Sequence, residues 1–302
     1  MDTKQIEYIL KIAEENNITK AAEKLFITQP ALNQQLLKLE KELGIQLFHR
    51  SRTDWRPTKA GTVYLENARR ILQIKQDAYR QIGDIVSDKK GTLSVGFTPG
   101  RGIEMFSAVY PEFHKEFPAI IVAPHELSVR KQQAMIARGE LDIGFLTLCS
   151  NHYTSDEYIQ IATEEIFLAI PAKHPLSELS SHQPGAAMFP ILPVTDLQYE
   201  PFVLMYKEST IRQLVDDIFE QAGFQPNVLF ETGNTNTILT MIRTNLCCGL
   251  IPYYYLRAEP EGIACFSLPS HPTWDLVASY RKHSYLTHAA RYFIELAGDY
   301  WK

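Results

Sequence analysis

This chain of 302 residues has only four cysteines, Cys149, Cys247, Cys248 and Cys265, and no two of them form a C-x-x-C pair. The low count excludes a dense disulfide framework and a cysteine-based zinc site, so we expect reduced, mostly buried thiols. The chain also lacks any apolar run near the ~20 residues that span a membrane. Its first residues include acids and form no signal-peptide core. We therefore expect a cytoplasmic protein that does not enter a membrane.

Motifs of catalysis are missing as well. The residues around Ser94 do not form G-x-S-x-G, because Thr92 stands where the first glycine is required. The nine histidines are scattered without an H-E-x-x-H pair, and Gly96, Gly100 and Gly102 do not complete a G-x-G-x-x-G loop. We therefore expect no enzyme activity, no cofactor and no metal site.

Positive charge is scarce, since 30 basic side chains face 35 acidic ones and the net charge is −5. Its distribution is uneven. Residues 1–60 carry ten basic and eight acidic side chains, whereas residues 91–302 carry 14 basic and 23 acidic ones. The small positive excess thus lies at the N-terminus, and it predicts modest affinity for a polyanion such as DNA. We expect more than one N-terminal domain to act together.

The N-terminal residues have the pattern of three short helices. Thr19 is predicted to cap the second helix and Thr28 the third, with Pro30 in a first turn that needs no N–H. Apolar side chains at helical spacing are expected to face inward: Ile6, Ile9, Leu10 and Ala13, then Ala21, Ala22 and Leu25, then Leu32, Leu36, Leu39 and Leu43. Two helices joined by a tight turn predict a helix-turn-helix, whose second helix lies in the major groove of DNA.

The third helix has an outer face that suits base recognition. Gln29, Asn33 and Gln34 point away from the apolar positions, and their amides can donate and accept at once. An ordinary three-helix bundle with a solvated amide face would show the same pattern. The next segment, 45–61, favours DNA binding, because it predicts a two-stranded wing with a turn at Asp54. Its basic side chains are expected to hold phosphates: Arg50, Arg52, Arg56 and Lys59.

Residues 1–88 resemble the N-terminal region of LysR-type transcriptional regulators. The matching segments are AAEKL (21–25), TQPALNQQL (28–36), LEKELGIQLFHR (39–50) and PTKAG (57–61). The resemblance implies a winged helix-turn-helix that binds a double-stranded DNA operator with the form of an interrupted palindrome.

Two positions of the third helix depart from that family. Asn33 stands where serine is usual and Gln34 where arginine is frequent, so the operator sequence of relatives does not transfer to this chain. We place the winged helix-turn-helix at residues 1–59 and add three residues to its DNA-binding surface: Thr19, Thr28 and Pro30.

Residues 60–88 are predicted to form one long linker helix, because they contain no proline and only Gly83 beyond Gly61. Residues at alternating spacings of three and four form a heptad seam with one polar interruption: Leu65, Ala68, Leu72, Lys75, Tyr79, Ile82 and Val86. The seam predicts dimerisation, while a helix packed on its own chain is the alternative. The family resemblance adds that such proteins commonly assemble as homotetramers, as dimers of dimers.

Strands and helices alternate through residues 91–302, which predicts an α/β region with a mostly parallel sheet. Strands are expected at 91–97, 119–127, 141–148, 166–176, 201–206, 227–232 and 276–282. We divide the region into lobe I, residues 91–163 with 267–302, and lobe II, residues 164–266. It resembles the family's effector-binding domain, which has a periplasmic-binding-protein type 2-like fold, best at KHPL (173–176) and GLIP (249–252). Asn245 and Cys247 stand where that family usually has glycine.

Ligands of open α/β sheets bind beyond the carboxyl ends of the strands. Residues at those ends offer hydroxyls and backbone N–H groups that suit a small anion: Thr98, Pro99, Gly100, Ser128, Thr147, Met205, Tyr206, Thr232 and Asn234. Arg101 and Arg130 either add positive charge or are merely exposed, and Phe97, Phe145 and Tyr206 fit a core or a cleft equally well.

The chain is thus interpreted as a homodimeric or homotetrameric LysR-type regulator whose effector changes lobe closure. The resemblance implies that this closure alters DNA bending and contact with RNA polymerase. Two alternatives remain open. One is a cytoplasmic solute-binding protein with a vestigial head, and the other is a regulator that responds to oxidation of Cys247 or Cys248.

Overall fold

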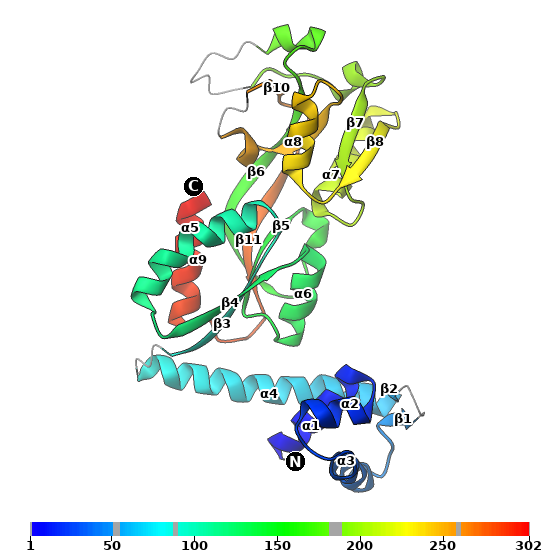
Figure 1. Cartoon of the computed structure of the whole chain (residues 1–302), viewed down its shortest axis with the longest axis vertical. Coiled ribbons are helices and arrows are strands. Elements are labelled where there is room, and N and C mark those ends of the chain that lie inside the picture. The colour runs from blue at the N-terminus through cyan, green and yellow to red at the C-terminus, as the bar shows by residue number, and fades with distance from the viewer. Residues whose placement is uncertain (1, 51–54, 87–89, 181–188, 258–260, 302) are drawn as a thin grey trace. The chain divides into compact units, whose positions relative to one another are not determined.

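The computed structural model describes residues 2–50, 55–86, 90–180, 189–257 and 261–301, and the chain divides into two compact units, residues 1–87 and 88–302. Figure 1 shows the helical N-terminal unit in blue and cyan and the mixed α/β unit in green to red. Each unit is described by itself.

The N-terminal unit is a winged helix-turn-helix followed by a long helix (Figure 1). Its elements are α1 (Thr3–Glu15), α2 (Ile18–Lys24), α3 (Gln29–Leu43), β1 (Phe48–Arg50), β2 (Trp55–Pro57) and α4 (Lys59–Ile85). The apolar positions of α1, α2 and α3 form one core with Leu47, Phe48 and Trp55 of the wing. The predicted three-helix arrangement and two-stranded wing are therefore confirmed.

Two details of the winged helix-turn-helix, called the head below, differ from the prediction. Asn17, not Thr19, caps α2, because its side-chain oxygen accepts the N–H groups of Thr19 and Lys20 at 2.9 and 3.1 Å. Leu43 is 45% exposed rather than buried. It lies in the last turn of α3, where Gly44 in the left-handed region (φ 70°) ends the helix, so no neighbouring element covers this side chain.

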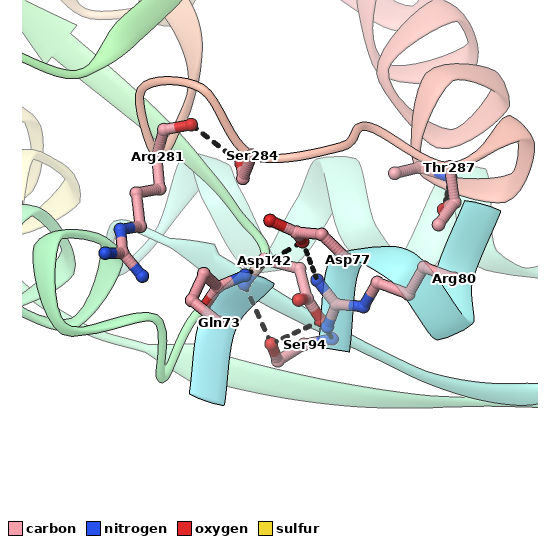
Figure 2. Close-up of polar contacts among 9 residues, drawn as sticks. Gln73, Asp77, Arg80, Ser94, Asp142, Arg281, Ser284 and Thr287 are labelled. Carbon is pink, nitrogen blue, oxygen red and sulfur yellow. Dashed lines mark hydrogen bonds and ion pairs between the residues drawn. The ribbon is translucent and has the colours of Figure 1, made fainter. Parts of the chain in front are cut away.

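Helix α4 departs from the predicted seam. Leu65 and Ala68 are buried in the core of their own head together with Tyr64, and Leu72 packs against the same core. The alternative of a helix packed on its own chain is therefore correct for this half of the helix. Farther along, Gln73 donates to Asp77 at 2.9 Å and Arg80 lies 4.0 Å from the same carboxylate, as Figure 2 shows.

A different apolar stripe of α4 is exposed. It repeats at spacings of three, four, four and three, which fits the 11-residue repeat of a coiled coil rather than a strict heptad: Ile71, Ile74, Ala78, Ile82 and Ile85. The predicted seam is therefore wrong in its first half, where Leu65 and Ala68 are buried in the head, whereas its later members Tyr79, Ile82 and Val86 are exposed.

The C-terminal unit has two lobes. Its helices and strands are β3 (Gly91–Phe97), α5 (Arg101–Glu116), β4 (Ile120–Glu126), α6 (Val129–Arg138), β5 (Ile143–Leu148), β6 (Glu157–Pro171), β7 (Pro201–Met205), α7 (Thr210–Ala222), β8 (Asn227–Thr232), α8 (Thr235–Arg243), β9 (Gly249–Pro252), β10 (Ile263–Phe266), β11 (Thr273–Tyr280) and α9 (His288–Trp301). Short 3-10 helices follow β5, β6 and β9 and precede β7.

The main sheet is mixed rather than mostly parallel. Its strand order is β10-β6-β11-β5-β3-β4, with β9 beside β6. Strand β3 is parallel to β4 and β5, but β11 returns antiparallel to β5 and β6, and β9 and β10 are antiparallel to β6. The strand β10 was not predicted. Its four residues are too few to show a period.

Strand β6 carries the chain from one lobe to the other. Glu157–Glu165 pair with β11, whereas Ile166–Pro171 pair with β9 and β10. In lobe I, α5 and α9 pack on one face of the sheet and α6 on the other (Figure 1). In lobe II, alternate residues of β6 face α7 and α8, so each face of this strand has its own core.

The base of β3 is fixed by a reciprocal pair. The carboxylate of Asp142 accepts the backbone N–H and the hydroxyl of Ser94 at 2.8 and 2.7 Å, and the Ser94 hydroxyl accepts the Asp142 N–H at 2.8 Å (Figure 2).

No helix in the described part of the chain is long and apolar enough to cross a bilayer.

Candidate DNA interface and effector cleft

The amino end of α3 presents the predicted base-reading residues. Thr28 caps the helix and its hydroxyl accepts the Ala31 N–H at 3.4 Å, as predicted. Gln29, Pro30 and Gln34 are exposed, whereas Asn33 is half-buried. The N-terminal turn of α3 is therefore open to a partner and carries amide side chains that can both donate and accept.

Phe26 lies in the turn that joins α2 to α3. Its side chain is 96% exposed and its backbone has a φ of 54°, in the left-handed region that disfavours aromatic residues. The sequence prediction did not include Phe26. The sequence feature that points to Phe26 is its position in the short turn between α2 and the Thr28 cap of α3, where a turn must place one residue outward.

The wing is anchored to α3 through Arg50. Its guanidinium pairs with the carboxylate of Glu40, which is buried and also accepts the backbone N–H of Leu47 at 2.8 Å. The same guanidinium lies 5.8 Å from the centroid of the Trp55 ring. Arg50 is therefore a structural link as well as a predicted phosphate contact. Arg56 and Lys59 are exposed, and Thr19 is exposed on α2, while Arg52 lies outside the described residues.

The two lobes of the C-terminal unit meet at Gly100. This glycine begins α5 with a φ of 76°, and a Cβ at its position would lie 3.4 Å from the Tyr255 hydroxyl and 3.9 Å from the Asn234 amide oxygen. Gly100 was predicted from lobe I and Asn234 from lobe II. The structure brings these two predicted cleft residues together.

Four predicted residues form one network in lobe II. The backbone N–H of Tyr206 donates to the Thr232 carbonyl at 2.9 Å, and the Thr232 hydroxyl accepts the Asn234 N–H at 3.2 Å. Asn234 in turn caps α8 by accepting the Asn236 N–H at 2.9 Å. Met205 lies at the end of the neighbouring strand, 3.9 Å from the Thr235 hydroxyl.

The remaining predicted residues are more dispersed. Ser128 takes the cap position of α6 but its side chain makes no capping bond, and Thr147 is buried within β5. Thr98 is half-buried and Pro99 is exposed in the β3–α5 turn. Phe97 and Phe145 belong to the core of lobe I.

Tyr255 is a cleft residue that the sequence prediction missed. Burial raises the pKa of its phenol, and the positive charge of Arg101, with the nearby Thr235 side chain and Arg101 backbone N–H, opposes that rise. Its hydroxyl therefore lies near the amino ends of α5 and α8. Tyr255 follows the recognisable GLIP segment by three residues, but nothing in that spacing shows which helix ends it reaches.

Arg101 is buried, so the expectation that it is merely exposed is wrong for this residue, whereas Arg130 is exposed. Asn245, which stands where the family usually has glycine, has a φ of 60°, in the left-handed region that asparagine tolerates.

All four cysteines are free thiols, and three of them are buried. Burial raises the pKa of Cys247 to about 11 and those of Cys248 and Cys265 to about 12, which suppresses the reactive thiolate. The described residues include no cluster of histidine, cysteine and acids that could hold a metal ion.

The fold and these surfaces define a helix-turn-helix protein with a two-lobed ligand-binding domain. Residues 3–62 match the bacterial regulatory helix-turn-helix protein model of the lysR family, and residues 87–302 match the LysR substrate binding domain. The chain therefore belongs to the LysR family of transcriptional regulators.

Similar proteins agree with this assignment. An uncharacterized HTH-type transcriptional regulator of Bacillus subtilis (strain 168), YcgK, is 30% identical over 99% of this chain and 94% of its own length. A full-length OxyR variant from Pseudomonas aeruginosa has the same fold with a TM-score of 0.70 at 20% identity, covering 99% of this chain and 97% of its own. Full-length CbnR, solved with its target DNA, has a TM-score of 0.56 at 21% identity, covering 98% and 99%.

Proposed function

We propose that this regulator acts in the cytoplasm as a dimer or a dimer of dimers on an interrupted palindrome. A small anionic effector that binds between the lobes then changes how the regulator binds DNA and how it contacts RNA polymerase. The observation that carries the proposal is the exposed amide-bearing turn at the amino end of α3, within a family whose members regulate transcription. The CbnR structure with target DNA supports the same use of the head.

The head divides its tasks between two groups of residues. Gln29, Asn33 and Gln34 read base edges, since amides can pair with both donor and acceptor groups of adenine. Arg56 and Lys59, with Arg50 and Arg52, hold phosphates and set the position of α3. Thr19, Thr28, Pro30 and the exposed ring of Phe26 flank this surface and contact the sugar-phosphate backbone.

Dimerisation uses the exposed stripe of α4. Ile74 is 69% exposed and Ile85 is 80% exposed, and the stripe that includes them has coiled-coil spacing. Burying it against a second copy pairs two heads, as a two-fold operator requires. Exposed apolar side chains in the C-terminal unit, Ile103 and Ile121 in lobe I and Leu229 and Phe230 in lobe II, supply further surface for a tetramer.

The effector cleft lies where Gly100 faces Asn234 and Tyr255. Backbone N–H groups at the amino ends of α5 and α8 favour an anion, and hydroxyls of Thr98, Ser128, Thr147 and Thr232 would complete its shell with Pro99, Met205 and Tyr206. Because each lobe supplies one helix end, a ligand that binds both ends stabilises the closed arrangement.

Footprinting tests the proposal directly. The full-length protein is expected to protect a two-fold site in the promoter region beside its own coding sequence. Absence of any protected site would instead favour a solute-binding protein. A thermal-shift panel of small organic acids tests the cleft, since a ligand at 100 times its Kd stabilises by about 2.7 kcal/mol. Loss of that shift in Asn234→Ala would tie it to the cleft.

A further inference from the structure

Gln132 of α6 places a polar amide inside lobe I. Its side chain is fully buried, and its Nε2 donates to the Leu127 carbonyl at 3.0 Å. Its Oε1 has no hydrogen-bond partner among the described residues. A buried amide with one unpaired group costs free energy that an apolar side chain of similar length would not cost. Stability alone therefore does not explain a glutamine at this position, and residues of this kind are typical of functional sites.

Two facing glycines make room for this amide. Gly96 of β3 pairs with Gly144 of β5, on the sheet that α6 covers (Figure 1). A Cβ at either glycine would lie 2.8 Å from Oε1 of Gln132, which is too close for a carbon atom. Any larger residue on either strand would therefore push the amide away from the Leu127 carbonyl. The two strands and α6 together set the position of one side-chain group.

The hydrogen bond from Gln132 fixes the turn between β4 and α6. The N–H of Leu127 donates to the Phe97 carbonyl at 2.9 Å, so β3 holds one backbone group of Leu127 and Gln132 holds the other. The next residue is Ser128, which is exposed and takes the cap position of α6 without a capping bond. The Ser128 hydroxyl is thus not committed to its own helix, and its position depends on how Leu127 is held.

We infer that Gln132 is a positioning residue of the effector cleft. It does not touch the effector. It holds Leu127 so that the Ser128 hydroxyl and the first N–H groups of α6, which lack acceptors within the helix, are presented to an anion. The inference rests on the strand-end cleft proposed above. An apolar side chain in place of Gln132 should therefore weaken anion binding without a large loss of stability.

Hydrogen exchange of the full-length protein without ligand tests the hold on the turn. Gln132→Met removes both the donor and the unpaired oxygen while it keeps the length of the side chain. The backbone N–H groups of Leu127 and of residue 132 are expected to exchange about tenfold faster, whereas those of β3 and β5 keep their protection. The melting temperature is expected to change by less than about 4 °C. Unchanged exchange at both N–H groups would overturn the inference.

Two further variants locate the effect. Gly144→Ala keeps Gln132 but displaces its amide, so the same two N–H groups should exchange faster, and this variant covers the case in which Gln132→Met does not fold. Gln133→Met is the matched control, because it removes an amide that donates to a different carbonyl, that of His152, at 2.8 Å. It should leave the exchange at Leu127 and Gln132 unchanged. An equal effect of Gln133→Met would show a general loosening of α6 and would refute the specific role of Gln132.

Anion binding separates positioning from a purely structural role. Inorganic sulfate and succinate are the probes, each titrated into the full-length protein by calorimetry. Gln132→Met and Gly144→Ala are expected to raise the Kd of the anion that binds by about tenfold. Faster exchange with unchanged binding would make Gln132 a structural residue only and overturn the inference. If neither anion binds the unmodified protein, the anionic effector proposed for the cleft is contradicted, and the exchange comparison by itself still decides whether Gln132 holds the turn.

Discussion

The guanidinium of Arg50 in the wing pairs with the buried carboxylate of Glu40 in α3, so an ion pair joins the wing to the recognition helix in addition to their shared apolar core. Glu40 also holds the Leu47 N–H at the start of the wing. The orientation of the basic wing relative to the base-reading turn therefore depends on a residue that touches no DNA in the proposed complex.

Replacing that carboxylate should loosen the wing. In Glu40→Gln the amide can still accept the Leu47 N–H, but it no longer neutralises Arg50. Because Arg50 is partly exposed, we expect a loss of only about 1–2 kcal/mol in the free energy of unfolding. Urea denaturation of the full-length protein measures it. Glu42→Gln, at an exposed position of the same helix, is the matched control, and an equal loss there would contradict the role of the pair.

Base reading and phosphate binding should separate experimentally. Gln34→Ala is expected to cost about 1–3 kcal/mol on the preferred operator and to relax the preference at one or two base pairs. Arg56→Ala should weaken binding to all sequences and lower the salt dependence by about one counterion. Binding titrations across salt concentrations and a set of operator variants test both. Indistinguishable profiles would remove the proposed division of tasks.

The α4 stripe should control assembly. Ile74→Asp introduces a charge into the exposed stripe, so we expect monomers by analytical ultracentrifugation without loss of the fold. Gln76→Asp lies on the same helix outside the stripe and should sediment like the unmodified protein. Leu72→Asp is a poorer test, because Leu72 packs against the core of its own head and its replacement should also lower stability. Unchanged sedimentation of Ile74→Asp would contradict this interface.

The buried thiols should resist modification. With the pKa of Cys247 raised from 9.0 to about 11, its thiolate fraction at pH 8 is about a hundredfold lower than that of an ordinary cysteine. We expect iodoacetamide to label Cys247, Cys248 and Cys265 slowly in the folded protein and quickly in urea. The folded state holds these protons more tightly, so their contribution to stability is full below about pH 9 and falls as the pH rises through the raised values. Rapid labelling of Cys247 or Cys248 at pH 8 would instead support the thiol-switch alternative.

The sequence predicted the parts of this fold that depend on local pattern. Caps and helical spacing located α1, α2 and α3, and alternation located β3 and β11, because both signals arise within a few residues. The spacing in α4 could not show which face the head covers, since two stripes on that helix have coiled-coil character. The pairing of Arg101 with Glu164 joins residues 63 positions apart, so no local pattern could reveal that Arg101 is buried.

The same limit applies to the sites. The strand-end rule selected Gly100 and Asn234, which do face each other. It did not find Tyr255, whose position depends on how the segment after β9 crosses between the lobes. Local rules therefore identify the ends of helices and strands, while the side chains that close a site depend on long-range packing.

Phe26 offers a test in which stability and DNA binding move in opposite directions. Its left-handed backbone is unfavourable for a phenylalanine, whereas asparagine tolerates that region, and its ring is almost wholly exposed. Phe26→Asn should therefore raise the free energy of unfolding by about 0.5–1 kcal/mol. If the ring contacts the sugar-phosphate backbone as proposed, the same variant should bind the operator and unrelated DNA several-fold more weakly. Thermal denaturation and DNA titration of one preparation measure both, with Ala31→Ser, at an exposed position in the first turn of α3, as a control for general changes at this surface. Higher stability with unchanged affinity would show that the exposed ring takes no part in binding DNA.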